Sequence, residues 1–392
     1  AGLIISERMR AQIAGLKQAI DNTETGITML QTAEGGLDEV NRALISARQL
    51  AVSSANEAVN DEAMLAANQA ELDNAMRTID RISRIANYGK KAILDGSMGA
   101  NGVTAGDHLE FVSANEKTQS SPVGGYQVEI KEAATRSSVQ GTIPLTQAMI
   151  DAKEQLTFTE GGVTLNFETI AGENVETTIN RLDKAIINSA MKIEIVRTPG
   201  SGTNPDAPQL LRFRHKEYGT EHSFQVASNT AGVLSSRTNT PDTIKNGLDV
   251  SGFIGGELGL GRGQILTGSV PTKVSGLKIR YTGEYAPPPG TYAGSVTLSQ
   301  NSLVFHVGPN PEQSTSFSLK SVNSKKLGNG IKNESGFRSL NDIEISDASK
   351  AQDAMRIIDK AIEEITTARG EMGAFQKNDL GSNLNYLRHA HE

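Results

Sequence analysis

The sequence predicts an α+β fold: a long antiparallel α-helical bundle, or coiled-coil rod, with a β-hairpin and an inserted β-rich α+β outer region. The first observation is the heptad spacing of apolar residues near both ends of the chain, which is typical of helices that pack side by side. The second is a middle region of short alternating runs separated by turns rich in Gly, Ser, Thr and Asn. The third is composition: 37% of the residues are hydrophobic, 4% are aromatic and Trp is absent, which favours several slender cores over one large core.

The longest expected element is an amphipathic helix over residues 3–55. Its apolar side chains fall on two rows, each at heptad spacing and displaced from the other by three or four positions. These rows are Met9, Leu16, Leu30, Leu37 and Leu44, and Ile13, Ile20 and Ile27. Such a helix would be about 80 Å long at about 1.5 Å per residue, so it cannot cover its own stripe. Other helices must pack against it.

Two further helices are expected to cover this stripe. One spans residues 61–85 and is capped by Asn60 or Asp61, and the other spans residues 346–388 and is capped by Ser346. Both repeat apolar residues in steps of three, four or seven, as amphipathic helices do. Their packing positions are Leu65, Leu72 and Ile79 in the first helix and Ala351, Met355, Ile358, Ile362, Ile365 and Met372 in the second.

Several residues interrupt these apolar rows. Thr23 and Glu34 fall where apolar residues belong, and Gly35 and Gly36 each cost the helix about 1 kcal/mol relative to alanine. The last helix is interrupted by Arg369, Gln376, Gly370, Gly373 and Gly381. One interpretation is a loosely optimised helix. The other is that small and polar residues leave room for neighbouring copies in a polymer that changes its packing.

The middle of the chain, residues 98–301, is predicted to be an outer insertion in a discontinuous helical core domain, residues 1–97 and 302–392. Its first part, residues 99–125, is rich in Gly, Ser, Thr and Asn and is expected to be a connector. Residues 126–228 alternate strand-like runs with one helical segment, which predicts a small α+β module. Residues 229–301 are expected to form a β-rich segment.

The residue inventory argues against several classes of function. A net charge of −7 supplies no basic face for nucleic acid, and no apolar run approaches the ~20 residues of a membrane span. The chain has no cysteine for thiol chemistry or disulfides. Gly89-Lys90 is followed by Lys91 rather than by the Ser or Thr of a phosphate loop, and the glycines at 255–263 do not have dinucleotide-binding spacing.

Metal chemistry is equally unsupported by the histidines. Only His389 and His391 are close in sequence, and two residues apart on a helix they point to different sides. The His-Glu-x-x-His pattern of a zinc protease is absent. The sequence therefore predicts no enzymatic activity, no metal site and no cofactor.

Motifs at both ends of the chain resemble the bacterial flagellins. Near the N-terminus these are Ala1-Gly-Leu-Ile-Ile-Ser-Glu-Arg-Met-Arg10, Ile27-Thr-Met-Leu-Gln-Thr-Ala-Glu-Gly-Gly-Leu37, Arg48-Gln-Leu-Ala-Val52, Ile79-Asp80-Arg81-Ile82 and Ile93-Leu-Asp-Gly96. Near the C-terminus they are Leu303-Val-Phe-His-Val-Gly308, Lys326-Leu-Gly328, Ile358-Asp359, Arg369-Gly370, Met372-Gly373-Ala374 and Asn383-Leu384-Asn385. They follow one another in the flagellin order and cover about the first 97 and last 90 residues.

The resemblance implies a structural subunit of the bacterial flagellar filament that self-assembles into a helical tube for motility. It implies secretion to the extracellular filament, with other flagellin subunits, an export chaperone, and cap and junction proteins as partners. Flagellins also have terminal helices that would lie before Ala1 and after Glu392, so this fragment is expected to fold without polymerising. The alternatives are a hook-filament junction protein, which shares the helices, and a surface adhesin or glycan-binding module carried by the insertion.

The resemblance also implies which residues contact other subunits or a receptor. Arg48, Asp80, Arg81 and Arg369 are candidate contacts between subunits. Arg48, Gln49 and Leu50 correspond to the segment through which an innate-immune receptor of animals recognises many flagellins. Because Gln49 replaces a carboxylate and Ser46 replaces a basic residue of that segment, weak or absent receptor recognition is expected.

Overall fold

The computed structural model of the chain describes residues 1–197 and 203–392. It divides into two compact units, which we call the helical unit and the outer unit. The helical unit comprises Ala1–Asn101, Ala114–Gln119 and Ser299–Glu392, and the outer unit comprises Gly102–Ser113 and Ser120–Leu298. The long helices lie in the first unit and most strands in the second, so the predicted α+β class is confirmed.

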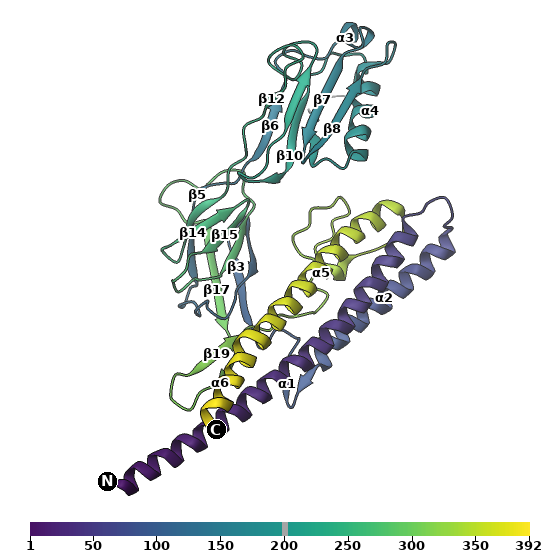
Figure 1. Cartoon of the computed structure of the whole chain (residues 1–392). Helices are drawn as coiled ribbons and strands as arrows, with labels where there is room; N and C mark the ends of the chain where they lie inside the picture. The colour runs from purple at the N-terminus through teal and green to yellow at the C-terminus, as the bar shows by residue number, and fades with distance from the viewer. Residues whose placement is uncertain (198–202) are drawn as a thin grey trace. The chain divides into compact units, whose positions relative to one another are not determined.

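Three helical segments build the helical unit. The helix α1 (Gly2–Ser54) packs against α2 (Glu62–Ile85) and against α5 (Ala348–Ala374), and Figure 1 shows α1 running between them. A π-helical stretch (Phe375–Gly381) then leads into α6 (Ser382–His391), which also packs on α1. The predicted pairing of the two ends of the chain is therefore present.

The helix starts follow local capping chemistry. Asp61 accepts a hydrogen bond from the Met64 N–H at 2.8 Å, as predicted for α2. The prediction of Ser346 as the next N-cap is wrong, because Asp347 accepts the bond from the Lys350 N–H at 2.8 Å. A carboxylate there also interacts favourably with the positive end of the helix dipole.

The core of the helical unit buries most of the predicted packing residues. Those buried are Leu16, Leu30, Leu37, Leu44, Leu72, Ile79, Ile358 and Ile365, and those half-buried are Ile20, Ile27 and Ile362. Ile13 does not pack as predicted and is 49% exposed, because the last buried residue of α6, Leu387, clusters with Leu16 and Ala19. Each fully buried Leu or Ile contributes about 1.5–3 kcal/mol relative to an exposed one.

The interruptions of the apolar rows have separate explanations. Thr23 is fully buried, and its hydroxyl donates to the Ala19 carbonyl at 2.7 Å, so the polar group is satisfied inside the core. A Cβ on Gly36 would lie 2.5 Å from Leu94 Cδ1, so glycine is needed there for packing. A Cβ on Gly35 would meet no described atom within 4 Å. Within the subunit, the packing therefore explains Gly36 and leaves Gly35 without a role.

The predicted β-hairpin is confirmed. It pairs β18 (Leu303–His306) with β19 (Ser314–Phe317), with Leu303 opposite Phe317. The Phe317 ring lies 4.8 Å from the Phe375 ring, centroid to centroid, at the start of the π-helical stretch. Two smaller features complete the unit: β1 (Asn87–Tyr88) pairs with β2 (Lys91–Ala92), and Leu340–Asp342 form a 3-10 turn.

An eight-stranded sheet occupies much of the outer unit. Its spatial order is β3 (Ala100–Ala105), β17 (Gly294–Gln300), β5 (Tyr126–Glu132), β13 (Ser251–Ile254), β14 (Glu257–Arg262), β15 (Ile265–Gly268), β16 (Lys278–Tyr281) and β4 (Leu109–Ser113). The strands β5, β13 and β17 lie in its interior, so their backbone groups are paired on both sides.

A second core in the outer unit joins two smaller sheets and two helices. The four-stranded sheet has the order β12 (Asp242–Thr243), β11 (Gln225–Ser228), β7 (Gln155–Glu160) and β8 (Val163–Glu168). The three-stranded sheet has the order β6 (Arg136–Gln140), β10 (Arg212–Tyr218) and β9 (Ile193–Ile195), and the helices are α3 (Gln147–Asp151) and α4 (Val175–Asn188). Phe158 and Phe213 bring the two sheets together, with ring centroids 4.8 Å apart.

Two predictions for the insertion need correction. The expected connector at residues 99–125 contains β3 and β4, the two edge strands of the eight-stranded sheet. The run beginning at Tyr126 does not join the small α+β module, because β5 pairs with β13 and β17. The glycine-rich stretch near residue 255 lies in the expected β-rich segment and forms strands, and Gly252 lies so close to the Glu129 carbonyl that a Cβ would overlap it. Such close approach explains glycine in a strand.

Candidate functional site

Three ion pairs tie α1 to the C-terminal helices along the helical unit. Arg48 Nε donates to Asp359 Oδ1 at 2.6 Å, and Arg369 Nη1 lies 3.5 Å from Asp38 Oδ1. Further along, Arg388 Nη2 donates to Glu24 Oε1 at 2.7 Å. All six side chains are at least one third exposed, so each pair contributes less than about 1 kcal/mol. Their main effect is to specify which positions of the two helices face each other.

The candidate contact Arg48 is therefore engaged within the subunit. Its hydrogen bond with Asp359, together with the attraction of that charge, raises the pKa of the guanidinium. Leu50 is half-buried against the helical core. Gln49 is exposed, and no described residue forms a hydrogen bond with its side chain. Of Arg48, Gln49 and Leu50, Gln49 is therefore the one that is exposed and has neither a hydrogen bond nor an ion pair with a described residue.

The remaining candidates, Asp80 and Arg81, differ although they are adjacent on α2. The Asp80 carboxylate accepts hydrogen bonds from the Ser324 N–H at 2.8 Å and the Ser324 hydroxyl at 3.0 Å, which fixes the loop after the hairpin. Arg81 is exposed and has no ion pair or hydrogen bond among the described residues. Arg81 is thus the charged candidate that is available to another molecule.

Buried carboxylates that the sequence analysis missed hold the segment before α5. Asp353 is 3% exposed and accepts hydrogen bonds from the Ser335 N–H at 3.0 Å and its hydroxyl at 2.5 Å. Glu364 accepts from the Gly328 N–H at 2.9 Å, and burial raises its pKa although this hydrogen bond lowers it. Both were hidden in the sequence because polar residues on an amphipathic helix are expected on its exposed face.

The first turns of α1 carry a continuous exposed apolar surface. Its members are Leu3, Ile4, Ile5, Met9 and Ile13, each between 49% and 76% exposed. Such a concentration of exposed apolar side chains is unusual on a monomeric surface and is typical of an interaction site. We call this group the α1 apolar surface.

The outer unit contains a histidine cluster that the sequence did not reveal. His215 is 1% exposed, its Nε2 lies 3.1 Å from Glu160 Oε1, and its ring stacks on His222 at 4.9 Å between centroids. Its Nδ1 accepts from the Glu217 N–H at 2.9 Å, so Nε2 carries the proton of the neutral ring. Burial raises the pKa of Glu160, but hydrogen bonds from the Lys192 N–H and His215 outweigh it, and the pKa is lowered.

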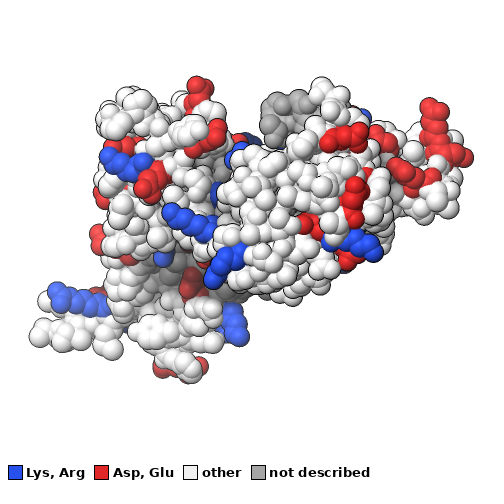
Figure 2. All heavy atoms as spheres, turned by 90° about the horizontal axis from the view of Figure 1, so that it is seen from above, with Lys and Arg blue, Asp and Glu red and all other residues white. Residues whose placement is uncertain are grey.

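The structure offers no alternative centre in its described part. Among the described residues, no group of three His, Cys, Asp or Glu side chains is placed to hold a metal ion. Over the same residues, no helix is both long and apolar enough to cross a membrane. On the face shown in Figure 2, Lys and Arg side chains are scattered among Asp and Glu and form no continuous basic patch.

Comparison with known proteins identifies the helical region. Residues 1–98 match the family model of the bacterial flagellin N-terminal helical region. The B-type flagellin of Pseudomonas aeruginosa is 27% identical over 446 aligned positions, which cover 100% of this chain and 81% of that protein. A flagellin of Halalkalibacterium halodurans is 47% identical over 95 residues, 24% of this chain and 35% of that protein. A flagellin of Salmonella typhimurium is 34% identical, over 38% of this chain and 31% of that protein.

Similar solved structures also come from flagellar proteins. The FliC structure from Burkholderia pseudomallei covers 90% of this chain and 99% of its own, with 15% identity and a TM-score of 0.30. A flagellar cap protein structure from Escherichia coli covers 88% of this chain and 74% of its own, with 9% identity and a TM-score of 0.35. The first four curated relatives are each matched over less than two thirds of their length, between 26% and 56%. The resemblance read from the sequence is confirmed: residues 1–98 match the bacterial flagellin N-terminal helical region, and the chain is similar to a bacterial B-type flagellin throughout its length.

Proposed function

We propose that this chain is a structural subunit of the bacterial flagellar filament, which self-assembles into a helical tube for motility. The observation that carries the proposal is that α1 and α2, which match the flagellin helical region, share one core with α5 and the π-helical stretch from the other end of the chain. The alignment with a B-type flagellin runs through both parts. The role is mechanical, and it needs neither catalysis nor a cofactor.

We propose different roles for the helical core domain and for the insertion. Residues 1–97 and 302–392 pack into the filament wall, and residues 98–301 face outward. Within the subunit, the buried apolar residues between the helices and the three ion pairs resist sliding of α5 and α6 along α1. Between subunits, the α1 apolar surface and Arg81 are the contacts we propose, because both are exposed and unpartnered among the described residues.

The proposed setting is extracellular. The chain would be secreted to the filament and meet other copies of itself, an export chaperone, and cap and junction proteins. Contact with the innate-immune receptor would be weak, because Arg48 is held by Asp359 and Gln49 supplies no charge. As the main role of the chain, a hook-filament junction role and an adhesin role are less well supported, since these sequence matches are to flagellins.

Assembly tests the proposal directly. The chain would be compared with a version extended at both ends by the corresponding segments of the P. aeruginosa B-type flagellin, in ammonium-sulfate-seeded samples followed by sedimentation and electron microscopy. Long tubes are expected from the extended chain. Short caps or no polymer from the extended chain would contradict a filament role.

A matched pair of variants tests the contact surface. Arg81→Glu and Lys245→Glu each change the net charge by the same amount, and both side chains are exposed without ion pairs among the described residues. Only Arg81 lies in the helical unit. In the extended chain, Arg81→Glu is expected to reduce polymerisation with an unchanged melting temperature, and Lys245→Glu is expected to polymerise normally. Equal polymerisation of the two variants would remove Arg81 from the interface.

A further inference from the structure

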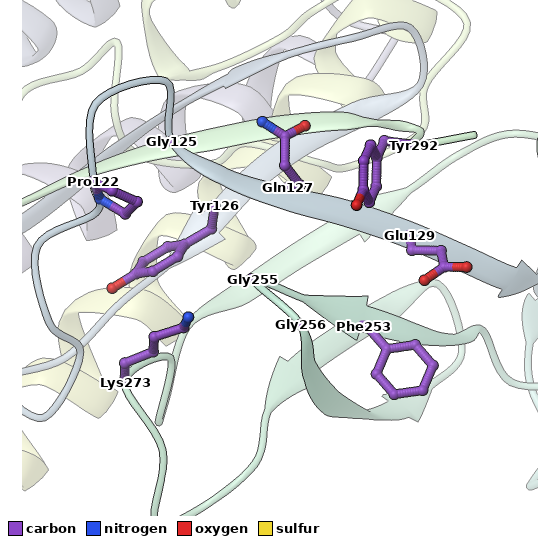
Figure 3. A pocket seen from close by; sticks show the side chains of 10 residues that line it. All are labelled: Pro122, Gly125, Tyr126, Gln127, Glu129, Phe253, Gly255, Gly256, Lys273 and Tyr292. Carbon is purple, nitrogen blue, oxygen red and sulfur yellow. The ribbon is translucent and has the colours of Figure 1, made fainter. Parts of the chain in front are cut away.

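A hollow on the eight-stranded sheet of the outer unit is lined by three aromatic residues (Figure 3). The whole chain has 10 Phe, 7 Tyr and no Trp in 392 residues. Three of these rings, from Tyr126, Phe253 and Tyr292, line this one hollow of about 370 Å³. That volume lies within the range of small-molecule sites in proteins, about 300–1,000 Å³.

Neighbouring strands set the positions of these side chains. Phe253 on β13 lies directly opposite Glu129 on β5, and Gln127 shares a face with Glu129 because it is two residues away. On the other side of β5, Ser295 of β17 lies opposite Gln127, and Tyr292 comes just before β17. In Figure 3, Tyr292, Glu129 and Phe253 lie toward one end of the hollow, and Tyr126 and Lys273 lie toward the other.

Two glycines keep the hollow open. Gly255 and Gly256, in the turn between β13 and β14, have φ angles of +59° and +81°, which L side chains rarely adopt. A Cβ on Gly255 would lie 2.7 Å from the Tyr126 ring. The turn therefore contributes backbone without a side chain that would fill the space.

The polar groups of the hollow are only partly used within the protein. Tyr292 is 61% exposed, and neither its hydroxyl nor the Gln127 amide has a hydrogen-bond partner among the described residues. Lys273 Nζ lies 5.8 Å from the centre of the Tyr126 ring and forms no ion pair with a described carboxylate. Glu129 is neutralised by Lys131, with Nζ 2.5 Å from Oε1. The hollow thus offers the rings of Tyr292 and Phe253, an amide, an ammonium and a paired carboxylate, whereas Tyr126 is 2% exposed and forms part of the wall.

These groups fit a ligand with both apolar faces and hydroxyls. Aromatic rings attract the weakly positive C–H surface of a sugar ring, while the amide, ammonium and carboxylate can exchange hydrogen bonds with its hydroxyls. A peptide strand would need an unpaired sheet edge, and β5, β13 and β17 are interior strands. We propose that this hollow binds a neutral sugar residue of a glycan, an activity of the outer unit that is separate from filament formation.

Binding of defined sugars to the whole chain tests the proposal. The probes are glucose, galactose, mannose, N-acetylglucosamine and their β-1,4-linked disaccharides, measured by saturation-transfer NMR and calorimetry. At least one is expected to bind saturably, and Tyr292→Ala or Phe253→Ala is expected to weaken that binding by about tenfold or more. Because Tyr292 is mostly exposed, its variant is expected to keep the wild-type melting temperature.

A second exposed tyrosine supplies the control. Tyr285 is 76% exposed, lies in the outer unit away from the hollow, and uses its backbone carbonyl rather than its side chain to accept from the Tyr281 hydroxyl. Tyr285→Ala is expected to bind sugar like the wild type. No saturable binding by any probe, equal binding by Tyr292→Ala, or binding of glucuronic acid alone would each overturn the proposal. Polymerisation is expected to be unaffected by Tyr292→Ala, so a failure here is distinct from failure of the filament role.

Discussion

Adjacent glycines in α1 allow a sharp test of how the helical unit is packed. Replacing glycine by alanine inside a helix stabilises it by about 1 kcal/mol. At Gly35 that gain should appear in full, since no described atom lies within 4 Å of the added Cβ. At Gly36 the Cβ would lie 2.5 Å from Leu94 Cδ1, so the Leu94 side chain, which is 1% exposed, would have to shift within the core. Overpacking of this kind costs about 1–3 kcal/mol.

We therefore expect Gly35→Ala to be more stable than the wild type by about 1 kcal/mol, and Gly36→Ala to be less stable than Gly35→Ala by about 1–3 kcal/mol. Urea unfolding followed by circular dichroism at the helix band measures the difference. An unchanged slope of the unfolding free energy against urea concentration would show that the unfolded states are comparable. Equal stabilisation by the two substitutions would refute the packing argument. If Gly35→Ala also blocks polymerisation of the extended chain, Gly35 makes room for a neighbouring copy.

Three further outcomes follow from the caps, the seam and the acid groups. Asp347→Ala is expected to lower the free energy of unfolding by about 1 kcal/mol while Ser346→Ala leaves it unchanged, measured by the same urea titration. Leu37→Asp is expected to unfold the helical unit, with a smaller loss for the half-buried Ile362→Asp; an unchanged melting temperature for Leu37→Asp would contradict the seam. The pKa of Glu160 is lowered on folding, so its contribution to stability is fully present above its unfolded value of 4.5 and is lost as the pH falls through the folded value. Melting curves of wild type and Glu160→Gln should converge in acid, and a constant gap from pH 7 to pH 3 would exclude this linkage.

The helical unit could be predicted from the sequence because its signals are local and periodic. Heptad spacing located α1, α2 and α5, and the cap at Asp61 follows from a short-range hydrogen bond. The cap before α5 was misplaced by one residue, because Ser346 and Asp347 are both good N-caps and only the backbone conformation distinguishes them. Ile13 lies at the heptad spacing of the apolar rows, but this spacing does not show where α6, the helix that would cover it, ends.

The outer unit was harder to predict because its strands pair over long sequence distances. The strand β5 satisfies its backbone with β13 and β17, more than one hundred residues away, and no local pattern announces those partners. Close backbone approach requires glycine at Gly252 and Gly261, and the local sequence does not show which strands approach there. The aromatic hollow was missed for the same reason, since its rings are far apart in sequence.

The π-helical stretch between α5 and α6 changes which side of the C-terminal segment packs against α1. Phe375 and Leu380 are both buried although they are five residues apart, a spacing that a π turn places on one side and an α-helix does not. One additional residue rotates the side chains of α6 about the helix axis by about 100° relative to a continuous α-helix. With that rotation, Leu384 and Leu387 are the residues of α6 that become buried. The C-terminal segment consequently packs on α1 with two different helical phases, and its contacts fall in two separate apolar clusters, one before α6 and one at Leu387.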